Sequence, residues 1–578
     1  MKFSWAIEPL ADLLVSLVHD RKLLIRMPLT PYTGPFGAPE LRHLIRRSLF
    51  GCSLGDMAHF NGMTLAQVVD ELLTFTNNTT PPIKTYWLPN GGTPDPTLVD
   101  PDVPYGSTWV NTPRANGLNP DPSGFRRNSF GGWHVGLMVE QERNLREKLV
   151  LFWHNLLVTQ ASTVQLGETI YRYFQLLRDN ALGNFRELMY ATSTDTGMLI
   201  YLNGYLNIAG SPDENYAREL MELFTLGEGS GYTEADVQAA ARVLTGWSIM
   251  LESGGNAIIP VTIFVPFLHD TTDKQFSPFF NNAVVQGATG PNAGQIELNA
   301  LLDMIFSKDE VSLHVCRELY HFFVHGEITA QTETDVIEPL ALIFRNNAGS
   351  PDQMRIVLEA LLTSEHFFSA NIVACMVKSP ADFVVGTLRE LDMTLPDATV
   401  PEAQYRIWQE IYALMDYCGQ SIGEPPNVAG WSAYYSAPQY DELWMDSATY
   451  AVRKLIYEYF TYVGFSTPGN LYDPASENLT FKADLVALVQ QFTDAEDPNV
   501  LVAEAADLLF TVSVSQGVKD QLKTGYLLLG QMNDAYWTSA YVTYVADPNT
   551  MDPVAQLVPT LLAGLFIDMQ GAAEHQLL

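Results

Sequence analysis

The stretch Asn144–Thr159, NLREKLVLFWHNLLVT, decides the fold class of this chain. Its large apolar residues recur three and four positions apart, at Leu145, Leu149, Phe152 and Leu156. This spacing places them on one face of an α-helix. Most of the other residues are apolar too, so we expect a helix that is buried on both sides within a mainly α protein.

Two polar residues interrupt the opposite face of this helix. At 100° per residue, Glu147 and His154 lie opposite the main stripe, beside Leu151 and Val158. They are roughly 10 Å apart along the axis, so each needs a partner from outside the helix. We expect a basic residue to pair with Glu147, and the arginine-bearing helix at 214–226 is a candidate source. Both residues are candidate catalytic groups in a pocket wall; the alternative is a pair of satisfied core groups that hold helices in register.

Helical patterns continue along most of the chain, and we expect helix to exceed half of the residues. Besides those discussed individually, helices are predicted at 38–49, 64–75, 170–190, 296–307, 310–325, 353–364, 380–391, 403–419, 446–462, 483–493, 499–512 and 516–532.

Two segments break the helical pattern because they are rich in Pro, Gly and Asn. Residues 77–132 are predicted to form a long irregular insertion, either a surface lobe or a cap over a site. Residues 252–295 are a second irregular insertion that could hold a small hairpin. The predicted fold is therefore mainly α, a large multi-helix globular body with long irregular insertions and at most minor β-hairpins. The expected domains are an N-terminal extension at 1–35, a main helical domain at 36–463 and a C-terminal helical region at 464–578 packed on it.

The composition argues against several classes of function. In 578 residues, 32 basic and 66 acidic side chains give a formal charge of −34, and 47% of the residues are hydrophobic. Nucleic-acid binding needs a basic footprint, so we expect no nucleic-acid partner. The apolar runs are too short for a transmembrane segment, and the four cysteines are too widely spaced for a thiolate zinc site.

The first residues of the chain do not resemble a secretory signal. Glu8 and Asp12 interrupt the apolar stretch Met1–Val18, and no small-residue cleavage site follows. We therefore expect a cytoplasmic location, while export by another route or with a partner stays open. Met27 is an alternative start.

A second helix carries clustered charge. Ser211-Pro212-Asp213-Glu214 matches a capping box, so we expect Ser211 to be the N-cap of a helix that stops at Gly227. The pattern on its polar face is typical of solvated ion pairs, but three carboxylates around one arginine could also bind a cation or a cationic substrate. Glu219 is a candidate catalytic residue here, and the candidate substrate-binding residues are Glu214, Asn215, Arg218 and Glu222.

The most metal-like spacing lies in the predicted helix at 310–325. Two imidazoles one turn apart, in His-x3-His, are a geometry that zinc or copper accepts. The zincin pattern is absent because Phe322 stands where it has glutamate. A solvated stripe opposite the apolar face is the alternative, so a divalent metal cofactor stays open. The weak candidate ligands are His314, Glu318, His321 and His325.

Two loops also carry candidate residues. His269 and Asp270 could act as a base with its orienting partner, and Lys274 follows as a candidate substrate-binding residue; a turn capped by Asp270 is the alternative. The sequence PPNVAGW at 425–431 predicts a rigid loop with a packed tryptophan. Asn427 and Trp431 are its candidate binding residues.

Several short motifs follow one another in a fixed order. They are LRHLIRR (41–47), REK (146–148), FWHN (152–155), DENYARELMELFTLG (213–227), GYT (231–233), LTGW (244–247), HD (269–270), CR (316–317), VKSP (377–380) and PPNVAGW (425–431). Together they resemble the bacterial domain-of-unknown-function 1800 family. The resemblance implies a largely helical fold and a sulfatase-like companion protein, but no reaction. Many members have histidine where this chain has Phe224, so a role resting on that histidine cannot apply here.

Two hypotheses of different classes remain. The first is a helical accessory, assembly or binding protein that acts with a sulfatase-like companion in handling exported or surface material. The second is an enzyme with a polar site built from the helix at 147–154, the helix at 214–222 and the loop at 269–274. Convergence of these three segments in one cleft would favour the enzyme, and their dispersal would favour the binding protein.

Overall fold

The computed structural model describes residues 29–76, 79–114, 117–468 and 477–578. Helix accounts for 54% of the residues, and the described strands form two-stranded antiparallel sheets only. The expected mainly α fold is therefore confirmed. Two predictions concern residues outside the described part of the chain: that Met1–Val18 is not a secretory signal, and that Met27 is an alternative start. Within the described part of the chain, no helix combines the length and apolar character that a membrane span requires.

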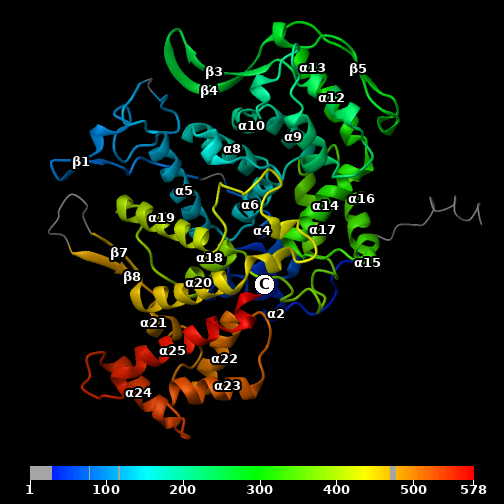
Figure 1. Ribbon diagram of the computed structural model, residues 1–578. Coiled ribbons are helices and arrows are strands. Elements are labelled where there is room, and N and C mark those ends of the chain that lie inside the picture. The colour runs from blue at the N-terminus through cyan, green and yellow to red at the C-terminus, as the bar shows by residue number, and fades with distance from the viewer. Residues whose placement is uncertain (1–28, 77–78, 115–116, 469–476) are drawn as a thin grey trace, which may run out of the picture.

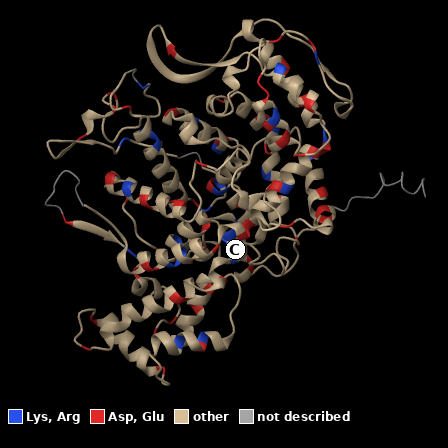
Figure 2. Ribbon diagram, viewed as in Figure 1, with Lys and Arg blue, Asp and Glu red and all other residues tan. Residues whose placement is uncertain are grey.

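The helices surround a continuous apolar core (Figure 1). Acidic and basic residues are spread over many of these helices (Figure 2). The α-helices are α2 (Ala38–Ser48), α3 (Leu54–Phe60), α4 (Leu65–Leu72), α5 (Ser123–Val139), α6 (Arg146–Leu156), α7 (Ala161–Val164), α8 (Gly167–Asp179), α9 (Phe185–Ser193), α10 (Thr196–Tyr201), α11 (Asn215–Glu219), α12 (Glu234–Val243), α13 (Ala293–Phe306), α14 (Asp309–Phe323), α15 (Ala330–Thr332), α16 (Glu338–Asn346), α17 (Gln353–Leu362), α18 (Pro380–Glu390), α19 (Pro401–Tyr417), α20 (Ser447–Glu458), α21 (Leu485–Val489), α22 (Pro498–Leu509), α23 (Gln516–Leu522), α24 (Ala535–Ala546) and α25 (Val558–Gln570). Short π-helical segments extend some of them: η4 (Leu220–Thr225), η7 (Glu333–Ile337), η10 (Tyr459–Val463) and η11 (Lys523–Leu527).

The strands pair as local hairpins, and one of them projects from the body (Figure 1). The projecting hairpin, at residues 247–264, overlaps the insertion at 252–295, for which the sequence predicts a small hairpin. Hairpins of this kind add little to the core, which is built by the helices. The pairs are β1 (Leu88–Asn90) with β2 (Thr93–Asp95), β3 (Trp247–Ser253) with β4 (Asn256–Phe264), β5 (Lys274–Gln275) with β6 (Val284–Val285), and β7 (Phe465–Pro468) with β8 (Asn478–Phe481).

Helix α6 is the buried helix that its sequence predicts. Every residue from Arg146 to Leu156 is buried, including Glu147 and His154. The helix contacts α8 on one side and α14 on another, so neither of its faces meets water. The burial of both polar residues is therefore confirmed.

The prediction of an irregular segment throughout 77–132 is wrong at its end, because α5 begins at Ser123. Glycines weaken an isolated helix, which masked this one in the sequence. In the fold they allow α5 to lie close against α19: a Cβ on Gly136 would lie 2.5 Å from the indole of Trp408. The predicted single helix at 170–190 is also wrong, since α8 ends at Asp179 and α9 begins after the N-cap Asn184.

The expected N-cap at Ser211 is wrong. Ser211 is exposed, and α11 begins four residues later. The backbone N–H of Asn215 instead donates to Oδ1 of Asp213, 2.8 Å away. The acidic residue of the motif therefore holds the start of the helix, because its carboxylate reaches the free N–H two positions on.

Replacing Asp213 with alanine is expected to lower the free energy of unfolding by about 1 kcal/mol, because a helix-starting N–H loses its acceptor. Ser211→Ala is the matched control and should change it by less than about 0.5 kcal/mol. Urea denaturation of both variants measures the difference. A larger loss for Ser211→Ala would contradict this assignment.

The C-terminal region is attached to the main body by buried polar contacts. Arg46 in α2 donates to the carbonyl of Leu508 in α22, 2.5 Å away. The backbone N–H of Lys378 donates to the carbonyl of Gln576 at 2.8 Å. Glu390 lies within 3.4 Å of His575 and 3.5 Å of Arg46, and all three side chains are fully buried. These contacts join segments far apart in sequence, as Figure 1 shows for α2 and α22.

Candidate functional site

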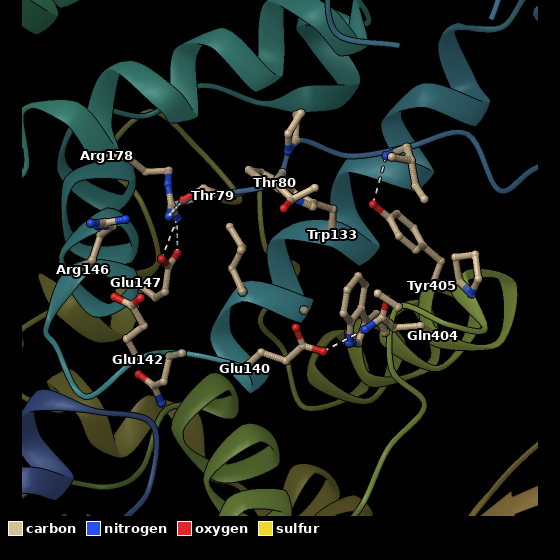
Figure 3. Close-up of a pocket in the computed structure, with 18 of the residues that line it drawn as sticks. Thr79, Thr80, Trp133, Glu140, Glu142, Arg146, Glu147, Arg178, Gln404 and Tyr405 are labelled. Carbon is tan, nitrogen blue, oxygen red and sulfur yellow. Dashed lines mark hydrogen bonds and ion pairs between the residues drawn. The ribbon is translucent and has the colours of Figure 1, made fainter. Parts of the chain in front are cut away.

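A cavity of about 460 Å³ lies beside the first turn of α6 (Figure 3). We call it the aromatic cavity. Its walls come from the segment 79–83, from α5, from the connection 140–147, from α8 and from the start of α19. The volume is within the range of small-molecule sites. The insertion at 77–132 contributes part of the wall, as a cap over a site would.

One end of the aromatic cavity is charged. Both carboxylate oxygens of Glu147 accept from NH1 of Arg178 in α8, at 2.7 and 2.5 Å. NH2 of Arg178 donates to Oγ1 of Thr79 at 2.9 Å. Burial raises the pKa of Glu147, and the adjacent Arg178 opposes this shift. The expected basic partner of Glu147 exists, but its predicted source in the helix at 214–226 is wrong.

The other end of the cavity is aromatic. Trp133 and Tyr405 lie there (Figure 3), and Trp408 is a further aromatic residue of the lining. The Trp133 indole N–H donates to the carbonyl of Thr80 at 2.7 Å, and the Tyr405 hydroxyl accepts from the N–H of Ile83 at 3.0 Å. These bonds fix the rings, so the cavity presents a rigid aromatic wall.

Two further polar side chains line the cavity. Glu140 accepts a hydrogen bond from Nε2 of Gln404 at 2.9 Å, and burial raises the pKa of this carboxyl group. Gln141 also lines the cavity, and its amide oxygen and nitrogen are both buried without a partner among the described residues. A buried amide with no partner costs free energy, and Gln141 also borders another cleft that Asp56 and Arg143 line.

His154 does not reach the aromatic cavity. Its ring is buried beside Phe174, and its Nε2 lies 3.0 Å from the carbonyl of Thr159, just beyond the end of α6. Burial lowers the pKa of His154 to about 4, so the ring is neutral at pH 7. Nδ1 has no partner in the described part of the chain. This geometry is that of a core histidine.

The loop candidates His269 and Lys274 are buried around a residue that sequence reasoning missed. Glu297 of α13 accepts from His269 Nε2 at 3.0 Å and from Lys274 at 2.5 Å. The other ring nitrogen of His269 lies 2.8 Å from the carbonyl of Thr245, and Asp270 pairs with Arg242 at 2.7 Å. All these groups are bonded to the protein, so they anchor the loop and leave no free group for a substrate.

The candidate residues on the charged helix formed by α11 and η4 have different surroundings: some form ion pairs, and one lines a second cleft. Arg218 pairs with Glu214 at 3.1 Å and with Glu234 at 2.5 Å, as expected of a solvated face. Asn215 donates to the carbonyl of Leu202. Burial raises the pKa of Glu219, which has no ion pair in the described structure. Glu222 lines a separate cleft, described below.

The four metal candidates do not form one site. His314 lies 4.0 Å from Glu318, but its Nε2 is occupied by the carbonyl of Leu223 at 2.7 Å. His321 stacks on Tyr440, and His325 lies beyond the end of α14. The described residues contain no group of three or more His, Cys, Asp or Glu side chains placed to hold a metal ion.

The loop at 425–431 packs against the end of α6. Trp431 is buried, and its backbone N–H donates to Oδ1 of Asn155 at 2.9 Å. A Cβ on Gly430 would lie 2.3 Å from that oxygen, so only glycine permits this approach. Asn427 donates to the hydroxyl of Tyr435 at 3.1 Å. The predicted rigid loop with a packed tryptophan agrees with this geometry.

The cavity residues that sequence reasoning missed carry no motif. The aromatic side chains lie in α5 and α19, far apart in the chain, and only their packing brings them together. A signal did exist for Arg178, because the burial of Glu147 requires a cation, but it does not say which one. The missed residues are Trp133, Glu140, Gln141, Arg178, Gln404, Tyr405 and Trp408.

The sequence model of a family described as a protein of unknown function, DUF1800, matches residues 43–548. No curated protein and no solved structure matches the chain.

Proposed function

This chain belongs to the DUF1800 family, and we propose that it is a binding protein that holds a saccharide unit in the aromatic cavity. It acts with a sulfatase-like companion in handling exported or surface material. The companion follows from the family resemblance, and the saccharide from the cavity.

We infer the class of ligand mainly from the amide of Gln141, which has no hydrogen-bond partner among the described residues. It needs a ligand group that donates and one that accepts, and a hydroxyl group does both. The aromatic wall of Trp133, Tyr405 and Trp408 offers flat surfaces against which the apolar face of a sugar ring can pack. Glu140 adds a carboxylate acceptor for further hydroxyls. A saccharide has both an apolar ring face and several hydroxyl groups, so it matches all three features.

The enzyme alternative has less support because its three segments lie apart. Glu147 lines the aromatic cavity, Glu222 lines a different cleft, and His269 is buried around Glu297. A site that combined them would need them in one cavity. Their dispersal favours a binding protein.

Replacing Gln141 with leucine is expected to have opposite effects on stability and on binding. The unliganded protein should become more stable by about 1 kcal/mol, because a buried amide without partners is exchanged for an apolar side chain of similar size. Saccharide affinity should fall about tenfold or more, because a donor and an acceptor are lost. Calorimetric titration with a panel of neutral mono- and disaccharides, together with urea denaturation, measures both effects.

Gln404→Leu is the matched control for stability. That amide already donates to Glu140, so its loss should destabilise the protein. If no saccharide of the panel binds the wild-type protein at millimolar concentration, the proposed ligand class is wrong. Affinity capture of the companion from the native host, with and without a bound saccharide, tests the partner.

A further inference from the structure

A second cleft, of about 530 Å³, lies where α14, η4 and the end of α6 meet. We call it the acidic cleft. It contains side chains from four motifs that are distant in the sequence but adjacent in the fold. Its lining residues include Asn155, Glu222, Glu228, Glu310, His314 and Glu318.

The acidic cleft carries uncompensated negative charge. Its one lining cation, Arg317, is already paired with Glu333 of η7 at 2.5 Å. Among the described residues, none of the four lining glutamates forms an ion pair with a lysine or an arginine. Burial lowers the pKa of His314 to about 4, so this neighbour of Glu318 is neutral at pH 7. Burial also raises the pKa of Glu318 to about 7, and the nearby Arg317 opposes this shift.

An independent feature of the cleft is an unpartnered donor. Asn155 is only 5% exposed, and the N–H of Trp431 holds its Oδ1 at 2.9 Å. Because the oxygen is fixed, the orientation of the amide is fixed as well. Its Nδ2 has no acceptor within the described part of the chain, and Asn155 is one of the residues that line the cleft. A ligand for this cleft must therefore offer an acceptor oxygen as well as positive charge.

The remaining surface of the cleft is apolar. Leu156, Leu223, Leu226 and Leu313 line it together with the charged groups. An alkyl stem can pack on such a surface while its charged end reaches the carboxylates. A bare metal ion would make no contact with this apolar surface. A polyamine would contact it but has no oxygen that accepts a hydrogen bond from Asn155.

We propose that the acidic cleft binds a lysine or arginine residue of a peptide, with the cationic end at the glutamates, the methylenes on the leucines and the peptide carbonyl on Nδ2 of Asn155. The site is separate from the aromatic cavity and does not depend on its ligand. The ligand is thus a basic segment of a partner polypeptide.

Titration of the full chain with the capped tripeptide acetyl-Ala-Arg-Ala-amide tests this proposal. We expect saturable binding, and at least tenfold weaker binding of the same peptide with the neutral isostere citrulline in place of arginine. Glu222→Gln and Glu318→Gln should each weaken binding several-fold, whereas Glu496→Gln in the C-terminal region removes the same charge and should not. Affinity should rise as pH increases through 7, because Glu318 then ionises. Equal binding of the two peptides would overturn the proposal.

Asn155→Asp separates the donor role from simple charge. Aspartate keeps the oxygen that accepts from Trp431 but replaces the donor with another negative oxygen. If charge alone attracts the peptide, this variant binds more tightly. The proposed contact predicts several-fold weaker binding, and spermidine, which lacks an acceptor, should show no such loss with this variant. Tighter peptide binding by Asn155→Asp would overturn the role assigned to Asn155.

Discussion

Replacing Arg178 with methionine is expected to lower the free energy of unfolding by about 3–5 kcal/mol. The substitution leaves the carboxylate of Glu147 buried in α6 without the two hydrogen bonds from NH1, at 2.7 and 2.5 Å. Such a carboxylate must either take up a proton or remain charged in a poorly solvated site, and both cost free energy. The midpoint of urea denaturation and the melting temperature measure the loss.

Two further variants show whether this loss comes from the buried charge. Combining Arg178→Met with Glu147→Leu removes both charges and should recover most of the stability. Arg186→Met breaks ion pairs with the exposed carboxylates of Glu187 and Asp303, so it should cost less than about 1 kcal/mol. If the double variant were as unstable as Arg178→Met alone, the loss would come from packing, and the ion-pair argument would be wrong.

The role of Glu147 shows how far the sequence alone could reach. The spacing of apolar residues around α6 was enough to predict its burial and the need of Glu147 for a basic partner. The identity of that partner depends on which helix packs against α6, which periodicity does not encode. Arg218 was the candidate from the nearest recognisable charged motif, but it lies on a solvated face with Glu214 and Glu234.

The aromatic cavity could not be predicted from the sequence for a related reason. Its wall forms because α5 and α19 approach closely at Gly136, where the indole of Trp408 takes the place of a side chain. A glycine-rich helix and a distant tryptophan give no local pattern that connects them. Similarly, the sequence makes His269 a candidate catalytic base in a loop, but its bond to Glu297 depends on where α13 lies in the fold.

The neutral buried histidines should make the protein sensitive to mild acid. Burial lowers the pKa of His154, His314 and His575 to about 4 and that of His43 to about 3. In the unfolded chain a histidine takes up its proton near pH 6.5. Between these values the unfolded state binds more protons, so falling pH favours unfolding by up to about 1.4 kcal/mol per pH unit for each histidine.

Buried carboxyl groups act in the opposite direction. Burial raises the pKa of Glu318 to about 7 and that of Asp195 to about 6. Near pH 5 the folded state therefore binds protons at these carboxyls that the unfolded state releases. Because the four histidines outnumber the two carboxyls with a shift of comparable size, the unfolded state binds more protons near pH 5, and stability should fall as the pH decreases. His134, whose pKa burial lowers well below 6.5, adds to the fall.

Urea denaturation at intervals from pH 7 to 4.5 tests this acid sensitivity, with two variants that shift the slope in opposite directions. His154→Gln should make the slope shallower by about 1 kcal/mol per pH unit, since one proton difference is removed, and its amide can still donate to the carbonyl of Thr159. Asp195→Asn should make the slope steeper, because it removes an opposing group while asparagine still caps α10. If both variants kept the wild-type slope, protonation of these buried groups would not govern the stability of the fold.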